Sequence, residues 1–517
     1  MRCSIAGVLA VAAATAASAQ SSPPRDTLVE ARRLRDAGEF AAAAALVRPY
    51  VEAHPGDPGS ARFAALMSYW AKDVRTADSI YAAALDRHSK DHELRLEYAQ
   101  LLVETGNGSR ARAVLTPFAL SSIDSATDVP ATTLARASAL IGTLAYWSGD
   151  YVDARRQFAE ALRLDSSHAE ARRQLREIEM ATATWFRVGA AGWDDDQPLQ
   201  RFTASAEGGW FANPLTPLTL RTQTSRFGAD GFAETVSAVD GTLAAYVPKG
   251  RLELSLGAGL LQRTFGDGTD WTGRAALGVR LLANTLLQVS AQRAPYFNTA
   301  ASLSTPIMTR SVDGLLRWRH KEWMAEAVAR QETYPDDNDI TTGYAWFLAP
   351  LIRRAGGTLQ AGYSFTTQSA TSNRFVPRDE ALVFPPRPDP TTVPGEYDPY
   401  YTPRNLRVHS ALASARLAPN ERWTLTTDIT VPLHARDDAP VLIAVPSPPD
   451  VEIVRAYSER RFSPWNVRGG IDVALTEAAH IALSVEHGQR AYYEFSSVSL
   501  SGTYTFVAAA RRRADRR

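Results

Sequence analysis

Hydrophobic and polar residues alternate along the C-terminal part of the chain. In the segment 422–433, Trp423, Leu425 and Ile429 share one parity, while arginine, threonine and aspartate residues occupy the other. Alternation with a period of two is typical of a β-strand that has one apolar and one polar face. The pattern recurs from about Thr184 to Phe506. It predicts about sixteen strands, centred near residues 188, 206, 221, 242, 255, 277, 289, 315, 327, 345, 362, 411, 427, 470, 484 and 501.

The predicted strands are long, and the connections between them alternate in length. Strands of roughly ten or more residues exceed the usual five or six. Every second connection is a short turn, such as Asn213-Pro214, while the others include the two longest, 371–404 and 436–461, both rich in proline. Short turns at one end and longer loops at the other are typical of a transmembrane antiparallel β-barrel. We therefore predict such a barrel of about sixteen strands over residues 184–506.

A helical period replaces the alternation between residues 27 and 180. Ala43, Ala77 and Ala111 are spaced 34 residues apart, which is the period of the tetratricopeptide helix pair. Larger residues follow each alanine by four positions, and a final unit contains Ala154 and Phe158. The pattern predicts an N-terminal α-solenoid of tetratricopeptide repeats. The chain as a whole is therefore expected to have two domains, an α-solenoid followed by the β-barrel.

Stacked repeats form a concave surface that can bind protein partners. The candidate residues for a partner-binding groove are Tyr81, Leu115, Tyr146 and Phe158. The alternative is that the repeats act only as a spacer, and the sequence leaves both interpretations open.

The composition indicates an exported protein that does not bind nucleic acid. Residues 1–19 contain Arg2, an apolar run and small residues before Gln20, which is typical of a cleavable signal peptide. The single cysteine, Cys3, lies inside it, so the mature chain has no disulfide. Without Arg2 the chain has 55 Lys and Arg against 56 Asp and Glu, a net charge of −1 (55 − 56), which does not favour nucleic acid. Residues 507–517 form a basic tail.

Charged residues gather on the polar parity of the predicted strands. A charge that faces lipid near the bilayer midplane costs about 2–4 kcal/mol, so this parity is expected to face the lumen. Twelve arginines there exceed seven carboxylates, and an arginine excess favours anionic permeants. Mutual arginine–carboxylate pairs that fill the barrel are the alternative. The predicted pore-lining residues are Arg251, Glu253, Arg274, Arg280, Arg317, Arg319, Arg330, Arg407, Arg422, Asp428, Arg468 and Arg490.

Motifs of catalysis are absent from the sequence. It contains no His-Glu-x-x-His zinc motif, no nucleophile elbow and no phosphate-binding Gly-x-x-x-x-Gly-Lys segment. We therefore expect no enzymatic activity, no cofactor and no metal site.

The domain order and one short motif resemble a known group of proteins. A signal peptide, tetratricopeptide repeats and a C-terminal barrel resemble the exopolysaccharide export porins, including the cellulose synthase outer-membrane subunit, and the smaller YaiO-type outer-membrane proteins. The segment Tyr400-Tyr401-Thr402-Pro403-Arg404-Asn405 is similar to the Tyr-rich entry to a late strand of the cellulose-type barrel. The cellulose-type proteins have a longer repeat array. The shorter array here implies a separate partner that bridges the periplasm.

Two functions follow from these features. The resemblance implies a conduit in the outer membrane of a Gram-negative bacterium that exports an exopolysaccharide, with the repeats in the periplasm. Its expected partners are lipid or lipopolysaccharide, a polysaccharide chain, and periplasmic or inner-membrane synthase proteins bound by the repeats. The alternative is a non-conducting anchor whose repeats recruit periplasmic proteins.

Overall fold

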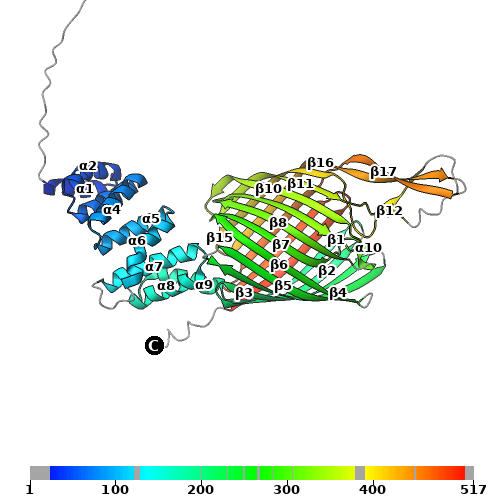
Figure 1. The fold of residues 1–517 in the computed structure, drawn as a ribbon, viewed down its shortest axis with the longest axis horizontal. Helices are drawn as coiled ribbons and strands as arrows, with labels where there is room; N and C mark the ends of the chain where they lie inside the picture. Colours follow the sequence, from blue (N-terminus) through cyan, green and yellow to red (C-terminus); the bar gives the residue numbers. More distant parts are fainter. Residues whose placement is uncertain are drawn as a thin grey trace, which may run out of the picture. The chain divides into compact units, whose positions relative to one another are not determined.

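A computed structural model describes residues 24–121, 129–197, 199–229, 231–248, 251–264, 268–282, 284–304, 307–378, 391–447 and 450–506 (Figure 1). The predicted signal peptide, residues 1–19, and the basic tail, residues 507–517, lie outside the described residues. The chain divides into two compact units, one mainly of helices and one that contains the barrel together with residues 148–152 and the helical residues 175–181.

The helical unit consists of antiparallel helices joined by short turns. Aspartates begin several of them, because their side chains accept hydrogen bonds from backbone N–H groups that have no partner inside the helix. Asp57 accepts from Gly59, Asp73 from Thr76 and Asp91 from Leu94. None of the helices in the described residues is both long enough and apolar enough to cross a membrane. The helices are α1 (Pro24–Asp36), α2 (Phe40–Ala53), α3 (Pro58–Trp70), α4 (Val74–Arg87), α5 (His92–Glu104), α6 (Gly108–Ser121), α7 (Ala131–Trp147), α8 (Tyr151–Leu164) and α9 (Ala169–Ala181).

The predicted repeat phase is confirmed by the core of this unit. The phased alanines and the residues four positions after them are at most 2% exposed; they are Ala43, Val47, Ala77, Tyr81, Ala111, Leu115, Ala154 and Phe158. The turns repeat with the same period. Gly38 and Gly106 have φ angles of 79° and 78°, and Lys72 has a φ of 68° at the equivalent position. Small residues therefore recur where helices approach closely, and a left-handed residue recurs where each helix pair turns.

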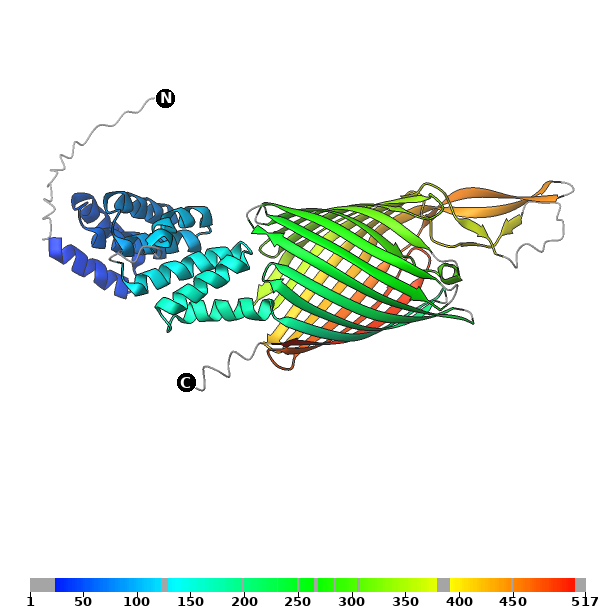
Figure 2. The same ribbon diagram turned by 60° about the horizontal axis from the view of Figure 1, so that its bottom comes forward.

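The second unit is a closed antiparallel barrel (Figure 2). Every strand of the ring pairs with two neighbours, and β20 pairs with β1 from Thr184↔Phe506 to Asp195↔Phe495, which closes the sheet. Sixteen strands of the described chain form the ring, as predicted from the sequence. They are β1 (Thr184–Asp195), β2 (Gln200–Asn213), β3 (Thr216–Ala229), β4 (Phe232–Val247), β5 (Leu252–Arg263), β6 (Thr269–Leu282), β7 (Thr285–Pro295), β8 (Met308–His320), β9 (Trp323–Thr333), β10 (Asp339–Arg354), β11 (Gly357–Ala370), β15 (Leu406–Asn420), β16 (Trp423–Ser447), β18 (Trp465–Ala474), β19 (Ala479–Gln489) and β20 (Glu494–Phe506).

The two ends of the barrel differ as the connection lengths predicted. We call one end the turn end, because it has the short connections and both ends of the barrel chain, Thr184 and Phe506. The opposite end, the loop end, has the longer connections, including residues 296–307, which contain the short helix α10 (Ala301–Ser304), and residues 371–405.

The two longest connections contain strands that the sequence-based prediction treated as loops. The last residues of β16 pair with β17 (Asp450–Arg461) in a hairpin that extends beyond the ring (Figure 1). The connection before it contains β12 (Phe375–Pro377), β13 (Thr391–Val393) and β14 (Gly395–Tyr397). Val393 and Leu442 are buried and pack against each other where β13 pairs with β16. The prolines in these segments suggested loops, but proline is compatible with edge strands, which leave one side of the backbone unpaired.

Gly142 provides a test of the helical packing. A Cβ atom at this position would lie 2.7 Å from Cε1 of Phe158, whose ring is fully buried. Gly142→Ala should therefore overpack the core and destabilise the repeat unit by about 1–3 kcal/mol. The measurement is the loss of helical circular dichroism on heating. Gly56→Ala is the matched control, because a Cβ atom there would meet nothing within 4 Å. Equal melting of the two variants would contradict this packing.

Candidate functional site

The two faces of the barrel wall differ in chemistry. On β5, Leu254, Leu256 and Leu260 share one parity and are 43–63% exposed, whereas Glu253 and Ser255 occupy the other parity. The same division holds around the ring, where the large exposed side chains of one parity are leucine, valine, phenylalanine and tryptophan. A continuous apolar outer face is what contact with lipid requires. The polar parity therefore faces the lumen.

Ion pairs link neighbouring strands on the lumen side. Arg280 lies 2.6 Å from Glu253, and Arg317 lies 2.7 Å from Glu326. Arg330 pairs with Asp313, and Arg187 lies 3.6 Å from Glu207. Each pair joins adjacent strands and neutralises an arginine that would otherwise contribute to a positive lumen.

Other lumen-facing arginines contact hydroxyl groups. Arg274 donates to the hydroxyl of Thr242 at 2.5 Å, and Arg468 donates to the hydroxyl of Ser484 at 3.1 Å. Arg274 lies opposite Gly257 and Gln292, whereas Arg468 lies directly opposite the carboxylate residues Asp428 and Glu486 of the two neighbouring strands. The wall thus contains arginines that are ion-paired and arginines that are not. Both the predicted arginine lining and the predicted arginine–carboxylate pairs describe a part of it.

The predicted pore-lining residues do not form one ring. Arg251 and Arg422 lie in turns at the turn end, and Arg490 lies in the β19–β20 loop at the loop end. Arg280 with Glu253 is the one pair of predicted residues that an ion pair brings together in the described chain. The residues on the lumen parity of strands are Glu253, Arg274, Arg280, Arg317, Arg319, Arg330, Asp428 and Arg468.

Arg407 lies on the opposite face from the one predicted. In β15 the lumen parity contains Val408, Ser410 and Ser414, and Ser414 donates to Asp428 on β16 at 2.7 Å. Arg407 has the other parity, with the exposed Leu417. The alternation misled the prediction because the apolar Leu406 and Val408 face inward and line a cavity with loop residues, rather than facing lipid.

Tyrosines from several loops meet inside the loop end of the barrel. We call this group the mouth tyrosines; it comprises Tyr296, Tyr334, Tyr397, Tyr400, Tyr401, Tyr492 and Tyr493. Tyr334 and Tyr400 stack with ring centroids 3.7 Å apart, and Tyr296 packs edge-on against both. Tyr401 contacts Tyr492 at 4.2 Å and Tyr397 at 4.8 Å. The rings thus connect the β7–β8, β9–β10, β11–β15 and β19–β20 loops.

This aromatic group bridges the mouth rather than lining one side of it. The β7–β8 and β19–β20 loops are separated by eight strands in either direction around the sixteen-stranded ring. The ring centroids of Tyr492 and Tyr401 are 4.2 Å apart, and those of Tyr296 and Tyr400 are 6.2 Å apart, so loops from opposite sides of the ring meet through the β11–β15 loop. The loop end is therefore narrowed by inward-folded loops.

Tyr400 is the hydrogen-bonded centre of the bridge. Its side chain is 1% exposed, and its hydroxyl donates to the Asp336 carboxylate at 2.7 Å and accepts from the Asn338 amide at 3.1 Å. Burial raises the pKa of Tyr400 to about 12. Arg374 lies 2.5 Å from the same carboxylate. The β7–β8 loop joins the bridge through Thr299, whose hydroxyl donates to the Pro399 carbonyl at 2.6 Å.

A second network fixes the base of the β16–β17 hairpin to the bridge. Asp437 is 2% exposed and accepts two hydrogen bonds from Arg460, at 3.0 and 2.6 Å. The hydroxyl of Tyr401 also donates to Asp437, at 3.2 Å. Burial and then the Asp437 charge raise the pKa of Tyr401. A buried carboxylate with three donors is fully satisfied, which favours one defined arrangement of this region.

Two cavities lie on the lumen side near the bridge. The first, of about 590 Å³, combines aromatic rings with amide and charged groups; its lining includes Tyr344, Gln368, Tyr401, Asn466, Glu486, Arg490, Tyr492 and Tyr493. The second, of about 530 Å³, includes Trp193, Arg201, Arg221, Gln223, Phe227 and Asn298. Aromatic faces beside a few polar groups suit ligands with an apolar face and hydroxyl groups, as in a sugar ring.

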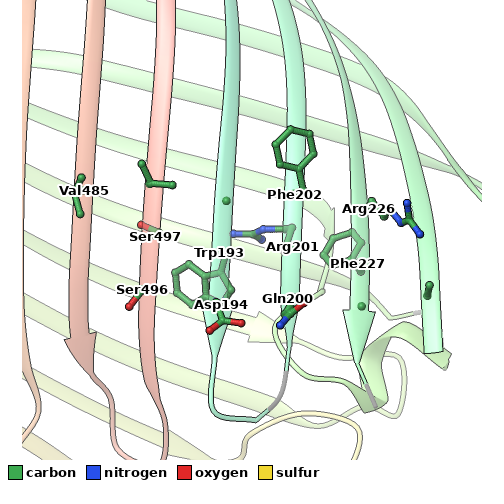
Figure 3. Close-up of a pocket in the computed structure, with 14 residues that line it drawn as sticks. Trp193, Asp194, Gln200, Arg201, Phe202, Arg226, Phe227, Val485, Ser496 and Ser497 are labelled. Carbon is green, nitrogen blue, oxygen red and sulfur yellow. The ribbon is translucent and has the colours of Figure 1, made fainter. Parts of the chain in front are cut away.

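Neighbouring strands hold the aromatic part of the second cavity in place. Figure 3 shows the adjoining pocket of about 750 Å³, which shares Trp193, Arg201 and Phe227 with the second cavity. Trp193 of β1 stacks on Phe495 of β20, with ring centroids 4.4 Å apart and an interplanar angle of 9°. Arg201 of β2 lies 5.5 Å from the centre of the Trp193 ring, in a cation–π contact. The seam between the first and last strands thus presents a rigid aromatic surface to the lumen.

The predicted groove of the helical unit is not formed by the residues that were named for it. Tyr81, Leu115 and Phe158 are at most 2% exposed and belong to the core. Tyr81 stacks on Tyr98 at 5.8 Å and donates to Glu97 at 3.3 Å. Tyr146 is half-buried. The repeat alignment marked these positions because they recur, and they recur because they hold each helix pair together.

The mouth tyrosines were missed by the sequence-based choice of site residues. From the sequence, Tyr400 and Tyr401 are named only within a motif, and Tyr492 and Tyr493 are not identified as site residues. The available signal was a pair of tyrosines next to a strand end, in a connection at the loop end. In the described residues, no three metal-binding side chains lie close enough to hold an ion.

Comparison with known proteins gives likenesses of fold. No protein-family model matches the sequence, and no curated protein matches it. Among solved structures, the bacterial polysaccharide outer membrane secretin is 9% identical with a TM-score of 0.46, covering 63% of this chain and 99% of that chain. CdiB from Acinetobacter baumannii is 9% identical with a TM-score of 0.36, covering 62% and 60%. MamA from Desulfovibrio magneticus RS-1 is 15% identical with a TM-score of 0.26, covering 30% and 82%.

At these identities and scores the likenesses do not extend to what the chain binds.

Removing Tyr400 should loosen the bridge. Tyr400→Ala removes a stacked ring and a hydrogen bond to a carboxylate, and such hydrogen bonds contribute about 1.5–3 kcal/mol. We expect trypsin to cleave the 371–405 loop faster, while the barrel keeps its heat-modifiable migration in gels. Tyr400→Phe should give an intermediate rate, because it keeps the ring on Tyr334 and loses only the hydroxyl. Unchanged cleavage in Tyr400→Ala would mean that the loops are held by other contacts.

Proposed function

We propose that this protein is an outer-membrane conduit that passes a polysaccharide chain across the membrane. The observation that carries the proposal is a closed sixteen-stranded ring with a polar lumen, whose loop end combines aromatic, amide and charged groups in two cavities. Barrels of this strand number are wide enough for an aqueous channel. Sugar polymers offer apolar ring faces for stacking and hydroxyl groups for hydrogen bonding, which matches this lining.

The proposed orientation follows from the connections. Short turns of bacterial barrels face the periplasm and long loops face outside. The helical repeats precede β1, and the chain enters the barrel at the turn end. The repeats therefore belong in the periplasm, where their surface is available to synthase proteins or to a bridging partner.

The proposed polymer is anionic or neutral. Of the twelve arginines counted on the polar parity, eight lie on the lumen parity of strands (12 − 4) against seven carboxylates, so the preference depends on arginines that are not ion-paired. Arg274 is such a residue, because it donates to the hydroxyl of Thr242 and lies opposite Gly257 and Gln292. Rings and clusters of arginine favour anionic permeants. The ion-paired arginines, such as Arg317 with Glu326, contribute little to this preference.

The charge preference can be measured with the full-length protein in planar bilayers. Wild type should pass anions better than cations, and Arg274→Gln should reduce the permeability ratio, because a lumen-facing arginine that is not ion-paired is lost. The matched control is Arg317→Gln with Glu326→Gln, which removes one charge of each sign and should leave the ratio unchanged. Cation preference in the wild type would contradict the proposed polymer class.

The sugar site can be measured in the same bilayers. Neutral glucan oligomers and uronate oligomers of equal length should block the ion current when added on the loop side. Tyr493→Ala should weaken the block roughly fivefold, because an aromatic contact contributes about 1 kcal/mol. Leu500→Ala on the outer face is the control and should leave the block unchanged, because Leu500 is 53% exposed and lines neither cavity. Block by neither oligomer would argue against a sugar conduit.

The alternative is a non-conducting anchor whose repeats recruit periplasmic proteins. The tyrosine bridge across the mouth and the ion pairs on the inner wall favour it. A folded, heat-modifiable protein that gives no current, even as Tyr400→Ala, would support the anchor and exclude the conduit.

A further inference from the structure

A row of arginines crosses the outer face of the barrel near the loop end. Arg407 on β15 is directly opposite Arg436 on β16, and Arg436 is directly opposite Arg461 on β17. We call these three residues the arginine row. They come from three successive strands and lie side by side at one level of the wall.

The register shows that the row points outward. A β-bulge at Leu433 shifts the pairing, so that Ser410 is opposite Pro432 whereas His409 is opposite His434. Beyond the bulge, Ala435 and Asp437 are buried on the lumen parity, and Arg436 has the outer parity. An extra residue in one strand reverses which side chains face out, and here it moves an arginine onto the apolar face.

The row lies at the border of the apolar band. Leu433 is 64% exposed and Val431 is 50% exposed on the same face, both nearer the turn end. At about 3.3 Å per residue, three residues place Arg436 roughly 10 Å beyond Leu433. His409 and His434, with ring centroids 6.2 Å apart, lie between the arginines and the apolar band. Polar aromatic groups at this depth are typical of the region of lipid head groups.

The positive charge of the row is only partly neutralised by the protein. Glu459 is shared, at 2.8 Å from Arg436 and 3.2 Å from Arg461. Arg407 is exposed, and its side chain makes no hydrogen bond or ion pair with any other residue that the structure describes. Like charges directly opposite each other on a sheet are destabilising. The row therefore needs an anion from outside the chain.

Neighbouring groups leave the patch positive. Arg404 lies 3.9 Å from Asp438 and 3.9 Å above the ring of Tyr457. Four arginines thus face two carboxylates, a difference of +2 (4 − 2) with neutral histidines. Arginine binds phosphate through parallel N–H groups, which favours it over a point charge at such sites.

We propose that the arginine row binds the phosphate groups of an anionic lipid in the leaflet at the loop end, with the acyl chains lying against Leu433 and Val431. This inference rests on the membrane placement of the proposed function and does not depend on whether the barrel conducts. Lipid binding here would hold the base of the β16–β17 hairpin against the membrane surface.

The test uses the full-length protein in a non-ionic detergent, with native mass spectrometry as the readout. The probes are diphosphorylated lipid A, the same lipid with its phosphates removed, and inorganic phosphate. Wild type should bind the phosphorylated lipid at least tenfold more tightly than the dephosphorylated one. Arg407→Gln with Arg461→Gln should lose most of this preference, while the remaining Arg436–Glu459 pair stays neutral.

The matched control is Arg226→Gln with Arg310→Gln. These two arginines are exposed, have the outer parity and lie near the loop end, but each belongs to a different part of the wall. The control should bind the phosphorylated lipid within twofold of wild type. Equal losses of affinity for the phosphorylated lipid in both variants would show that any surface arginine contributes equally, and would overturn the proposed site. Inorganic phosphate binding with the same dependence on the row would show a free-anion site and overturn the lipid assignment.

Failure of this inference is distinguishable from failure of the proposed function. Heat-modifiable migration in gels checks that each variant is folded, and both variants should keep the wild-type conductance. Wild type without current but with row-dependent lipid binding would exclude the conduit and keep the lipid site. Current without lipid binding that depends on the arginine row would keep the conduit and exclude the lipid site.

Discussion

The closure of the sheet between β1 and β20 is the constraint on which the structure depends. A backbone N–H or carbonyl group that faces lipid has no water to bond with, so a sheet in a membrane must have no free edge. The twelve residues of β1 each find a partner in β20, 300 or more positions later in the chain. Arg187 shows the result at one position, because it lies 3.6 Å from Glu207 on β2 and donates to Thr503 on β20 at 3.1 Å.

Closure also decides the chemistry of each face. Once the ring is complete, each strand has one parity toward lipid and one toward the lumen, and a charge on the wrong parity is costly. That rule holds strictly only where lipid lies. Near the loop end it relaxes: Leu406 and Val408 face inward because loops cover them, and the bulge at Leu433 lets Arg436 face outward. The exceptions to the alternation therefore gather at the end where the polar head groups and the loops replace hydrocarbon.

The strands and repeats could be predicted from the sequence because both depend on local periods. Every predicted strand centre lies within a strand of the ring, and the 34-residue spacing of Ala43, Ala77 and Ala111 marks the buried small residues of the repeats. The bridge could not be predicted in the same way. Tyr400 meets Asp336, and Tyr492 meets Tyr401, only because the ring brings distant loops to one mouth. Arg407 was placed on the wrong face because its alternation with Leu406 and Val408 gives no sign of the loops that cover them. Tyr81, Leu115 and Phe158 were given to a groove because recurrence marks structural and binding positions alike.

The contacts within the mouth differ in strength, and the difference indicates where the bridge would part. The β7–β8, β9–β10 and β11–β15 loops are held together by buried hydrogen bonds, from Tyr400 to Asp336 and from Thr299 to Pro399. Breaking such bonds leaves buried polar groups without partners, at a cost of about 1–3 kcal/mol each. The β19–β20 loop meets Tyr397 and Tyr401 through the ring of Tyr492, with no hydrogen bond between these residues in the described chain. Ring contacts of this kind contribute about 0.5–1.5 kcal/mol and leave nothing unsatisfied when they separate. A polymer that reached the first cavity would offer its own ring faces to Tyr492 and Tyr401. Separation of Tyr492 from Tyr397 and Tyr401 would therefore exchange one stacking contact for another, while the hydrogen-bonded part of the bridge stayed in place.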